Sequence, residues 1–291
     1  MKIQSLSVCV PGGCPNDCKF CVSKMHRGDY ANQIEKNKRF RHLYREDYRE
    51  RLAFARDNGC NTLMFTGDGE PMINQPFMEM VAEMNKQLDK PFRMIELQTS
   101  GVLINDEVLR WLRNEIRVST ISLSLSSLFD DDVNQKYNGT PDKLKVNISS
   151  LCEEIKKYDF NLRLSLNMTD EYNDVSFHRI FKIAKKLGAD QITFRKFYTS
   201  PENDTPQDDW INDHSVNESF WPAFNQYVKE EGRRLERLPF GAWRYSVDGI
   251  STVIDDDCMS TNEEKEELKY LILRENCKLY TKWDDKGSLL F

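Results

Sequence analysis

The sequence has no apolar run of about 18 residues or more, the length that a membrane-spanning helix needs. Its first residues also lack the long apolar core of a secretion signal. We therefore expect no membrane association and a cytoplasmic location. No internal repeat or low-complexity segment occurs, and 291 residues suffice for one large α/β domain or for a domain with a small extension.

A surplus of positive charge is also absent. Lys and Arg together number 41 and Asp and Glu 47, which gives a net charge of −6. General nucleic-acid binders usually carry a basic surplus, so we expect no general nucleic-acid binding. Residues 36–51 are locally basic. That stretch is either a solvated helix face or a patch that recognises phosphate.

A disulfide framework is not expected from the eight cysteines, because the chain shows no secretion signal. Three of them, Cys14, Cys18 and Cys21, follow one another at the spacing C-x3-C-x2-C. Thiolates on one short loop can hold three corners of a 4Fe-4S cluster, whereas full protein ligation takes a fourth cysteine. No further cysteine follows in that loop, so the spacing favours a cluster with one open iron.

Two other interpretations of the three cysteines stay open at this point. A tetrahedral zinc site would take a fourth ligand, which Cys9 or His26 could supply. The thiols could also be unrelated and buried. Among the late cysteines, Cys258 is either a second cluster ligand, a hydrogen-atom donor or a partly buried thiol, and Cys277 is expected to be structural.

Apolar periodicity predicts strands that alternate with helices over the first 200 residues. The six predicted strands lie at residues 3–10, 62–66, 93–99, 121–125, 162–166 and 191–194. Such alternation predicts parallel βαβ units. Six units form either an open barrel or a doubly wound sheet, and both gather their functional loops at the carboxyl ends of the strands.

The pattern changes after residue 200. Residues 200–218 are polar and acidic and predict a loop or linker, and residues 220–235 predict a helix. An Asp-Gly pair within residues 244–254 predicts a hairpin, and residues 270–280 predict a second one. We therefore expect a core at residues 1–199 and a β-rich C-terminal extension at residues 200–291 that covers the substrate.

The cysteine spacing, with aromatic Phe20 before Cys21, resembles the signature of the radical S-adenosylmethionine (SAM) superfamily. A second segment, residues 67–71, directly follows the second predicted strand and resembles the superfamily's GGEP motif, which pairs with the amino group of SAM. Its residues are Gly67, Asp68, Gly69, Glu70 and Pro71, and Asp68 departs from the family pattern. The resemblance covers residues 5–198 and implies a partial TIM-type (β/α)6 barrel, a 4Fe-4S cluster on the three cysteines, and SAM as cofactor.

The resemblance extends to four single residues at strand ends. Thr99 lies in a turn similar to the family's T-N-G turn, Ser124 and Asn167 match positions that contact the ribose, and Arg195 ends the strand that lines the adenine or carboxylate pocket. Each also has an ordinary structural interpretation. Ser124 could be an interior residue of the barrel, Asn167 a turn-former and Arg195 half of a salt bridge.

The function that the resemblance implies is reductive cleavage of SAM by an electron from a flavodoxin or ferredoxin. The product, a 5′-deoxyadenosyl radical, abstracts hydrogen from a substrate, for which a small molecule or nucleotide is preferred. Group transfer from SAM and modification of a peptide or tRNA are alternatives on the same cluster. A non-catalytic zinc or iron–sulfur module is an alternative of a different class. No residue is assigned to catalysis of the hydrogen transfer.

Overall fold

The computed structural model describes residues 2–25, 45–238, 241–255, 267–283 and 290. Cys258, His26 and residues 36–44 of the basic stretch therefore lie outside the described residues. Residues 45–51 of that stretch belong to helix α3, Arg45–Asp57. Among the described residues, no helix combines the length and the apolar character that crossing a membrane requires.

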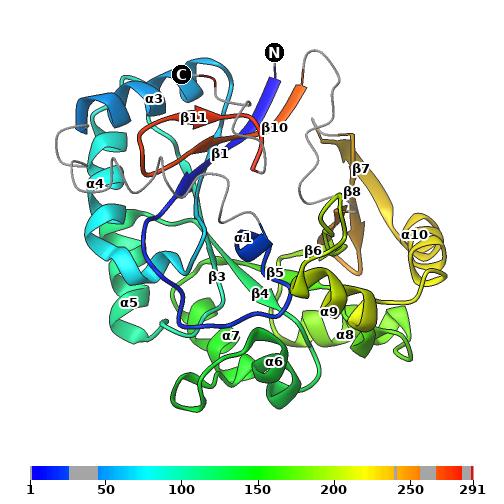
Figure 1. Ribbon diagram of the computed structural model, residues 1–291. Helices are drawn as coiled ribbons and strands as arrows, with labels where there is room; N and C mark the ends of the chain where they lie inside the picture. The colour runs from blue at the N-terminus through cyan, green and yellow to red at the C-terminus, as the bar shows by residue number, and fades with distance from the viewer. Residues whose placement is uncertain (1, 26–44, 239–240, 256–266, 284–289, 291) are drawn as a thin grey trace.

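The six predicted strands are all present and pair in parallel, in chain order. They are β1 (Lys2–Cys9), β2 (Thr62–Thr66), β3 (Met94–Thr99), β4 (Thr120–Leu125), β5 (Asn161–Asn167) and β6 (Gln191–Arg195). The helices between the strands are α3, α4 (Gln75–Lys86), α5 (Asp106–Trp111), α6 (Asp131–Asn138), α7 (Ile148–Lys157) and α8 (Phe177–Lys186). Figure 1 shows helices α3 to α8 outside this curved sheet. This is the α/β fold of a partial TIM-type barrel.

Every second residue of a strand faces outward towards the helices. These outward-facing residues are mainly apolar, so the core lies between the sheet and the helices. Leu63, Leu97 and Leu164 are fully buried on this outer face. Asparagine side chains begin several helices by accepting backbone N–H groups, as Asn74, Asn105 and Asn147 do for α4, α5 and α7. The inward-facing residues are different in kind, and they define the site.

The C-terminal residues extend the same sheet at both edges. Strand β9 (Ile250–Asp255) pairs in parallel with β6, and β10 (Glu267–Leu273) pairs in parallel with β1. Beyond them lie β8 (Trp243–Val247) and β7 (Arg233–Arg237) at one edge and β11 (Leu279–Tyr280) at the other. The complete order is β11-β10-β1-β2-β3-β4-β5-β6-β9-β8-β7. Eight neighbouring strands are therefore parallel.

The two edges of the parallel part approach each other, although β9 and β10 are far apart in the strand order. Lys269 Nζ of β10 lies 2.7 Å from Asp255 Oδ1 of β9, and both side chains are largely buried. The sheet therefore curls until its edges meet. We call this contact the seam.

Both predicted hairpins are confirmed. In the first, Asp248 and Gly249 join β8 to β9 with φ values of 50° and 83°, as a type I′ turn requires. The second joins β10 to β11, and Cys277 in its turn has a φ of 61° and is buried. A positive φ suits glycine, so the backbone of Cys277 is locally strained.

Two predictions for the extension were wrong. Residues 200–218 do not form a loop throughout, because α9 (Pro206–His214) lies within them. Thr205 and Asp208 form a capping box that starts this helix, and Pro206 sits in its first turn, which outweighs the acidic composition. The helix predicted at residues 220–235 ends early. It is α10 (Phe220–Glu231), and its last predicted residues belong to β7.

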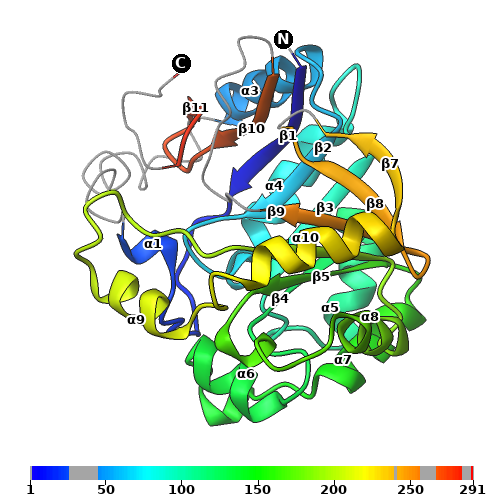
Figure 2. The ribbon, with the colours of Figure 1, turned by 90° about the vertical axis from the view of Figure 1, so that its right-hand side faces the viewer.

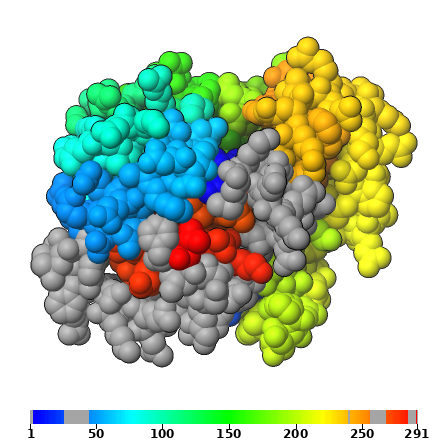
Figure 3. Space-filling view, turned by 90° about the horizontal axis from the view of Figure 1, so that it is seen from above, coloured from blue at the N-terminus to red at the C-terminus, as the bar shows by residue number. Residues whose placement is uncertain are grey.

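Helices α9 and α10 take different places (Figure 2). Helix α9 lies beside α1 (Val22–Met25), which follows the three cysteines, and α10 packs along β8. Figure 3 views the molecule from the side where β1 begins, and α3 and the β7–β8 region lie on opposite sides of that face. The extension therefore contributes both to the sheet and to the surroundings of the cysteine loop.

Candidate active site

A cavity of about 1310 Å³ occupies the inside of the curled sheet. Its wall includes the cysteine loop and residues 67–70 at the carboxyl ends of the strands, and it continues to residues near their amino ends, such as Gly59 and Asn61. All three predicted cluster cysteines and all of Gly67, Asp68, Gly69 and Glu70 line it. Apart from Pro71, which is buried and does not line the cavity, the residues of the two motifs are thus brought together around one space.

The three cysteines are free thiols on the loop that joins β1 to α1. Cys14 is exposed, and Cys18 and Cys21 are partly exposed. Burial raises the pKa of Cys18 to about 12, and the nearby Cys21 and Cys14 add to this shift through charge repulsion. Thiolates that repel each other in this way are a donor set for a cationic centre, which would reverse the repulsion.

Among the described residues, no group of three or more His, Cys, Asp or Glu side chains already has an arrangement that holds a metal ion. The fit to a cluster rests instead on the chemistry of the loop, which offers three thiols and opens onto the cavity. Cys9, one candidate for a fourth zinc ligand, is buried against Tyr270 and Ile272, and burial raises the pKa of its thiol strongly. The donor set therefore suits a cluster held at three corners.

The cysteine loop packs directly on the turn at residues 67–70. Glu70 N donates to Gly13 O at 3.1 Å, and Asn74 Nδ2 donates to Pro11 O at 2.8 Å. A Cβ atom at Gly69 would lie 2.3 Å from Gly13 O, so only glycine fits there. Ser23 Oγ, which is 3.0 Å from Cys21 Sγ, donates to the carbonyl of Asp68 at 3.3 Å. The two motifs are one structural unit.

The carboxylate of Glu70 is bound to the end of the neighbouring strand. It accepts hydrogen bonds from Thr99 Oγ1 at 2.6 Å and from Ser100 N and Oγ at 2.9 and 2.7 Å. Its side chain is buried, and Pro71 starts the short 3₁₀ helix η2 (Pro71–Asn74) after it. Glu70 therefore fixes the turn to the end of β3, and the backbone carbonyls of the turn are held in place at the cavity.

Asp68, the departure from the family pattern, pairs with the extension. Its Oδ2 lies 3.1 Å from Arg274 Nη1, and Arg274 is almost fully buried. The guanidinium also donates to Trp283 O at 2.8 Å and lies over the rings of Tyr280 and Trp283. The turn is thus held from one side by the cysteine loop and from the other by the β10–β11 hairpin.

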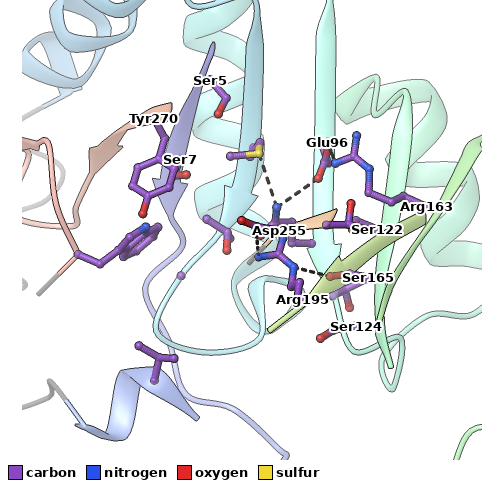
Figure 4. Close-up of a pocket in the computed structure, with 18 of the residues that line it drawn as sticks. Ser5, Ser7, Glu96, Ser122, Ser124, Arg163, Ser165, Arg195, Asp255 and Tyr270 are labelled. Carbon is purple, nitrogen blue, oxygen red and sulfur yellow. Dashed lines mark hydrogen bonds and ion pairs between the residues drawn. The ribbon is translucent and has the colours of Figure 1, made fainter. Parts of the chain in front are cut away.

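Ser124, Asn167 and Arg195 lie on three adjacent strands of the cavity wall, where Figure 4 labels Ser124 and Arg195. Asn167 Nδ2 of β5 donates to Ser124 Oγ of β4 at 3.4 Å. Arg195 of β6 donates from Nε to Ser165 Oγ at 2.6 Å, and its Nη1 lies 3.6 Å from Asp255 Oδ2. Ser124, Asn167 and Arg195 therefore share one region of the wall, whereas Thr99 is engaged with Glu70.

Several functional candidates were missed from the sequence. Glu96, Arg163 and Gln191 form a polar network inside the barrel, and Arg274 joins the extension to residue 68. A signal existed for two of them, since Glu96 and Arg163 each interrupt an apolar buried strand. Of the tryptophans, Trp283 lines the cavity, while Trp210 and Phe197 pack against Phe20 with ring centroids 5.5 and 4.9 Å away.

Comparisons with known proteins agree with this geometry. The family model of the radical SAM superfamily matches residues 8–184. An uncharacterised protein of Methanocaldococcus jannaschii is 25% identical over 181 residues, which cover 60% of this chain and 40% of the relative. The match therefore spans less than half of that relative's length.

Solved structures show the same fold. Native anSMEcpe with bound AdoMet has a TM-score of 0.58 at 13% identity, and the match covers 99% of this chain and 77% of that one. Coproporphyrinogen III oxidase (HemN) from Escherichia coli, a radical SAM enzyme, has a TM-score of 0.51 at 16% identity, over 80% of this chain and 54% of that one. Since the family model covers more than half of the sequence, the chain belongs to the radical SAM superfamily, whose members are enzymes that use a 4Fe-4S cluster and SAM.

Proposed function

We propose that this protein cleaves SAM reductively at a 4Fe-4S cluster held by Cys14, Cys18 and Cys21. When bound, the cluster and SAM supply a 5′-deoxyadenosyl radical that abstracts hydrogen from a small polar substrate. The observation that best supports this proposal is the packing of the cysteine loop on the turn at residues 67–70, at the mouth of a large cavity. Two cofactor-binding segments meet there in one rigid unit.

In this proposal the chain's own residues bind and orient SAM. Backbone carbonyls of Gly67, Asp68 and Gly69 face its ammonium group, and Glu70, Pro71 and Thr99 keep that turn in place. Ser124 and Asn167 contact the ribose, and Arg195 contacts the adenine or carboxylate end. The hydrogen bonds from Asn167 to Ser124 and from Arg195 to Ser165 support this role, because they hold the groups before SAM binds.

The C-terminal extension forms part of the same proposal. We divide the chain into a radical SAM core at residues 1–199 and an extension at residues 200–291 that covers the substrate. Residues of the extension, among them Asp255, Lys269 and Tyr270, line the cavity, which supports a role at the substrate. A cover of this kind excludes water and so protects a reactive radical from quenching.

The electron donor in this proposal is a flavodoxin or ferredoxin-type protein. Cys14 is exposed, so the cysteine loop reaches the surface where a donor could approach. We also propose a cytoplasmic location, since all cysteines in the described part of the chain are free thiols.

The test is anaerobic reconstitution followed by reduction. We expect about four irons per chain and conversion of SAM to 5′-deoxyadenosine with dithionite, both lost in Cys18→Ala. The control is Cys152→Ala, which removes a buried thiol from helix α7 and should leave both unchanged.

Three results would contradict the proposal in different ways. A loaded cluster without cleavage would reject the reaction. One zinc and no iron would favour a non-catalytic module. S-adenosylhomocysteine in place of 5′-deoxyadenosine would show that SAM serves as a group donor.

A further inference from the structure

The inside of this barrel is hollow, whereas a TIM barrel is normally filled by layers of bulky branched side chains. Inward positions on β1, β4 and β5 carry serines, namely Ser5, Ser7, Ser122, Ser124 and Ser165 (Figure 4). The resulting cavity, about 1310 Å³, exceeds the roughly 300–1,000 Å³ of a pocket for one small molecule. The barrel therefore has room for a second ligand besides SAM.

A polar network crosses the cavity wall below the proposed SAM residues. Arg163 donates from Nη1 to Glu96 Oε2 at 2.6 Å and from Nε and Nη2 to Gln191 Oε1 at 2.9 and 2.6 Å. Gln98 Nε2 donates to Glu96 Oε1 at 3.2 Å. We call these four residues the floor network.

The floor network lies deep in the barrel. Gln98 of β3, Arg163 of β5 and Gln191 of β6 are in register through Ser122 of β4. Gln191 precedes Arg195 by four residues on one strand, which is about 13 Å of strand length. The layer between them on β4, β5 and β6 holds only Ser124, Ser165 and Thr193. A ligand could therefore fill the space between the floor network and SAM.

The ion pair at the centre of the network fixes both amide groups. Because Arg163 donates twice to Gln191 Oε1, the Nε2 donor of Gln191 must point away from the guanidinium. Gln98 Nε2 donates to the carboxylate of Glu96, so the Oε1 acceptor of Gln98 takes no part in the network. Gln191 Nε2 and Gln98 Oε1 have no hydrogen-bond partner among the described residues, and both atoms are accessible to solvent. One donor and one acceptor are therefore available to a ligand.

Charge and polarity narrow the ligand class. Glu96 and Arg163 neutralise each other, so a charged group placed against the network would find no counter-ion in it. An apolar ligand would bury the serines and both amides without partners. The favoured ligand is therefore uncharged where it meets the network and rich in hydroxyl or amide groups.

We propose that the floor network, with Ser165 and Thr193 of the layer above it, forms the substrate site next to the SAM ribose at Ser124, and that the substrate is a small molecule whose inner end is an uncharged sugar or nucleoside. Identifying this ligand as the substrate rests on the proposed function, whereas the site itself does not. The inner end would accept a hydrogen bond from Gln191 Nε2 and donate one to Gln98 Oε1.

Equilibrium dialysis of the anaerobic, SAM-bound protein tests the site. One arm uses guanosine and uridine, a second uses ribose and glucose, and comparators are glutamate and decanoate. We expect at least one uncharged arm to bind with a Kd below about 1 mM and both comparators to bind at least tenfold more weakly. The arm that binds distinguishes a nucleoside from a sugar. No binding in either arm, or equal binding of the comparators, would overturn the proposal.

Two variants locate the binding. Gln191→Glu keeps the oxygen that Arg163 uses but removes the donor and adds charge, and Ser122→Val fills cavity space at the level of the floor network. Each should weaken the bound probe at least tenfold, with iron content and circular dichroism showing that the variant folds. The matched control is Ser149→Val on the exposed face of α7, with binding within twofold of the original. Binding that survives both cavity substitutions would place the ligand elsewhere.

The two proposals can fail separately. Probe binding without 5′-deoxyadenosine formation would reject the proposed reaction and keep the site. SAM cleavage by a protein that binds no probe would keep the reaction and reject the site.

Discussion

Gly69 and Gly13 bring the backbones of the two cofactor motifs into contact. This contact leaves no room for a side chain at Gly69. A Cβ at Gly69 would lie 2.3 Å from Gly13 O and 2.8 Å from its carbonyl carbon. Gly69→Ala should push the cysteine loop away from the turn. We expect at least a twofold loss of bound iron after anaerobic reconstitution and about a tenfold loss of SAM affinity, or about 1.4 kcal/mol.

The control for this substitution is Gly13→Ala, because a Cβ there meets nothing within 4 Å. Its iron content and SAM affinity should stay near those of the original protein. Full iron loading in Gly69→Ala would show that the two motifs do not depend on this contact.

The Asp68–Arg274 pair predicts that the extension positions the SAM loop. Arg274→Met leaves Asp68 without this partner, so the turn should loosen and SAM affinity should fall about tenfold by equilibrium dialysis. Asp68→Asn should have a similar effect, and the double variant should lose little more, with a coupling of about 0.5–3 kcal/mol. Arg110→Met, in an exposed pair with Asp106, is the control and should change nothing. Additive losses in the double variant would contradict the coupling.

At the residue scale, the sequence predicted the contiguous motifs and missed the distant partners. The three cysteines and residues 67–71 stand out because each set is local and follows a strand. Arg274 and Asp68 are 206 residues apart, and Glu96 and Arg163 are 67 residues apart. Only strand register brings such residues together, and no local pattern encodes it.

At the element scale, helix α9 depends on one buried carboxylate. Burial by itself would raise the pKa of Asp208, but hydrogen bonds from Ser200 and Thr205 outweigh it and lower the pKa to about 2. An aspartate whose pKa lies below the usual value of about 3.9 stabilises the fold above that pH, and it loses this contribution as pH falls towards 2.

The prediction is therefore an acid-dependent stability. The free energy of unfolding, measured with urea, should fall between pH 5 and pH 2 in the original protein. Asp208→Asn should cost about 1–3 kcal/mol at pH 7 and flatten that fall. Asp209→Asn, on the exposed side of the same turn, serves as the control. An unchanged pH profile in Asp208→Asn would show that another carboxylate governs the acid transition.

The strands of the core and both hairpins could be predicted because the alternation of the strands and the Asp-Gly turn of the first hairpin are local signals. Thr205, Pro206 and Asp208 form the sequence pattern of a capping box, which marks the start of a helix. Helix α9 was missed because the acidic composition of the segment was taken to indicate a loop. Strand β7 gave no signal, because all five of its residues are exposed and no alternation results. The places of β9 and β10 at opposite edges of the sheet depend on parallel pairing between distant segments, which the sequence does not reveal.

At the scale of the whole molecule, we expect the seam between β9 and β10 to stabilise the closed barrel. Lys269→Met removes the cation that meets Asp255 at 2.7 Å, while Arg195 remains near that carboxylate. We expect the free energy of unfolding to fall by about 1–3 kcal/mol and amide hydrogen exchange to accelerate in β9 and β10. Lys229→Met on the exposed face of α10 is the control. Unchanged exchange in both strands would mean that the seam is not a stabilising contact.

The pairing of β1 with β10 also orders events during synthesis. Residues 2–9 leave the ribosome well before their outer neighbour, residues 267–273. At 5–20 residues per second the interval is roughly 13–50 s. Throughout it, one edge of β1 lacks its final partner and could pair with another nascent chain. Strand β1 is made long before the strand that completes its pairing, so its edge stays open to aggregation until residues 267–273 are made.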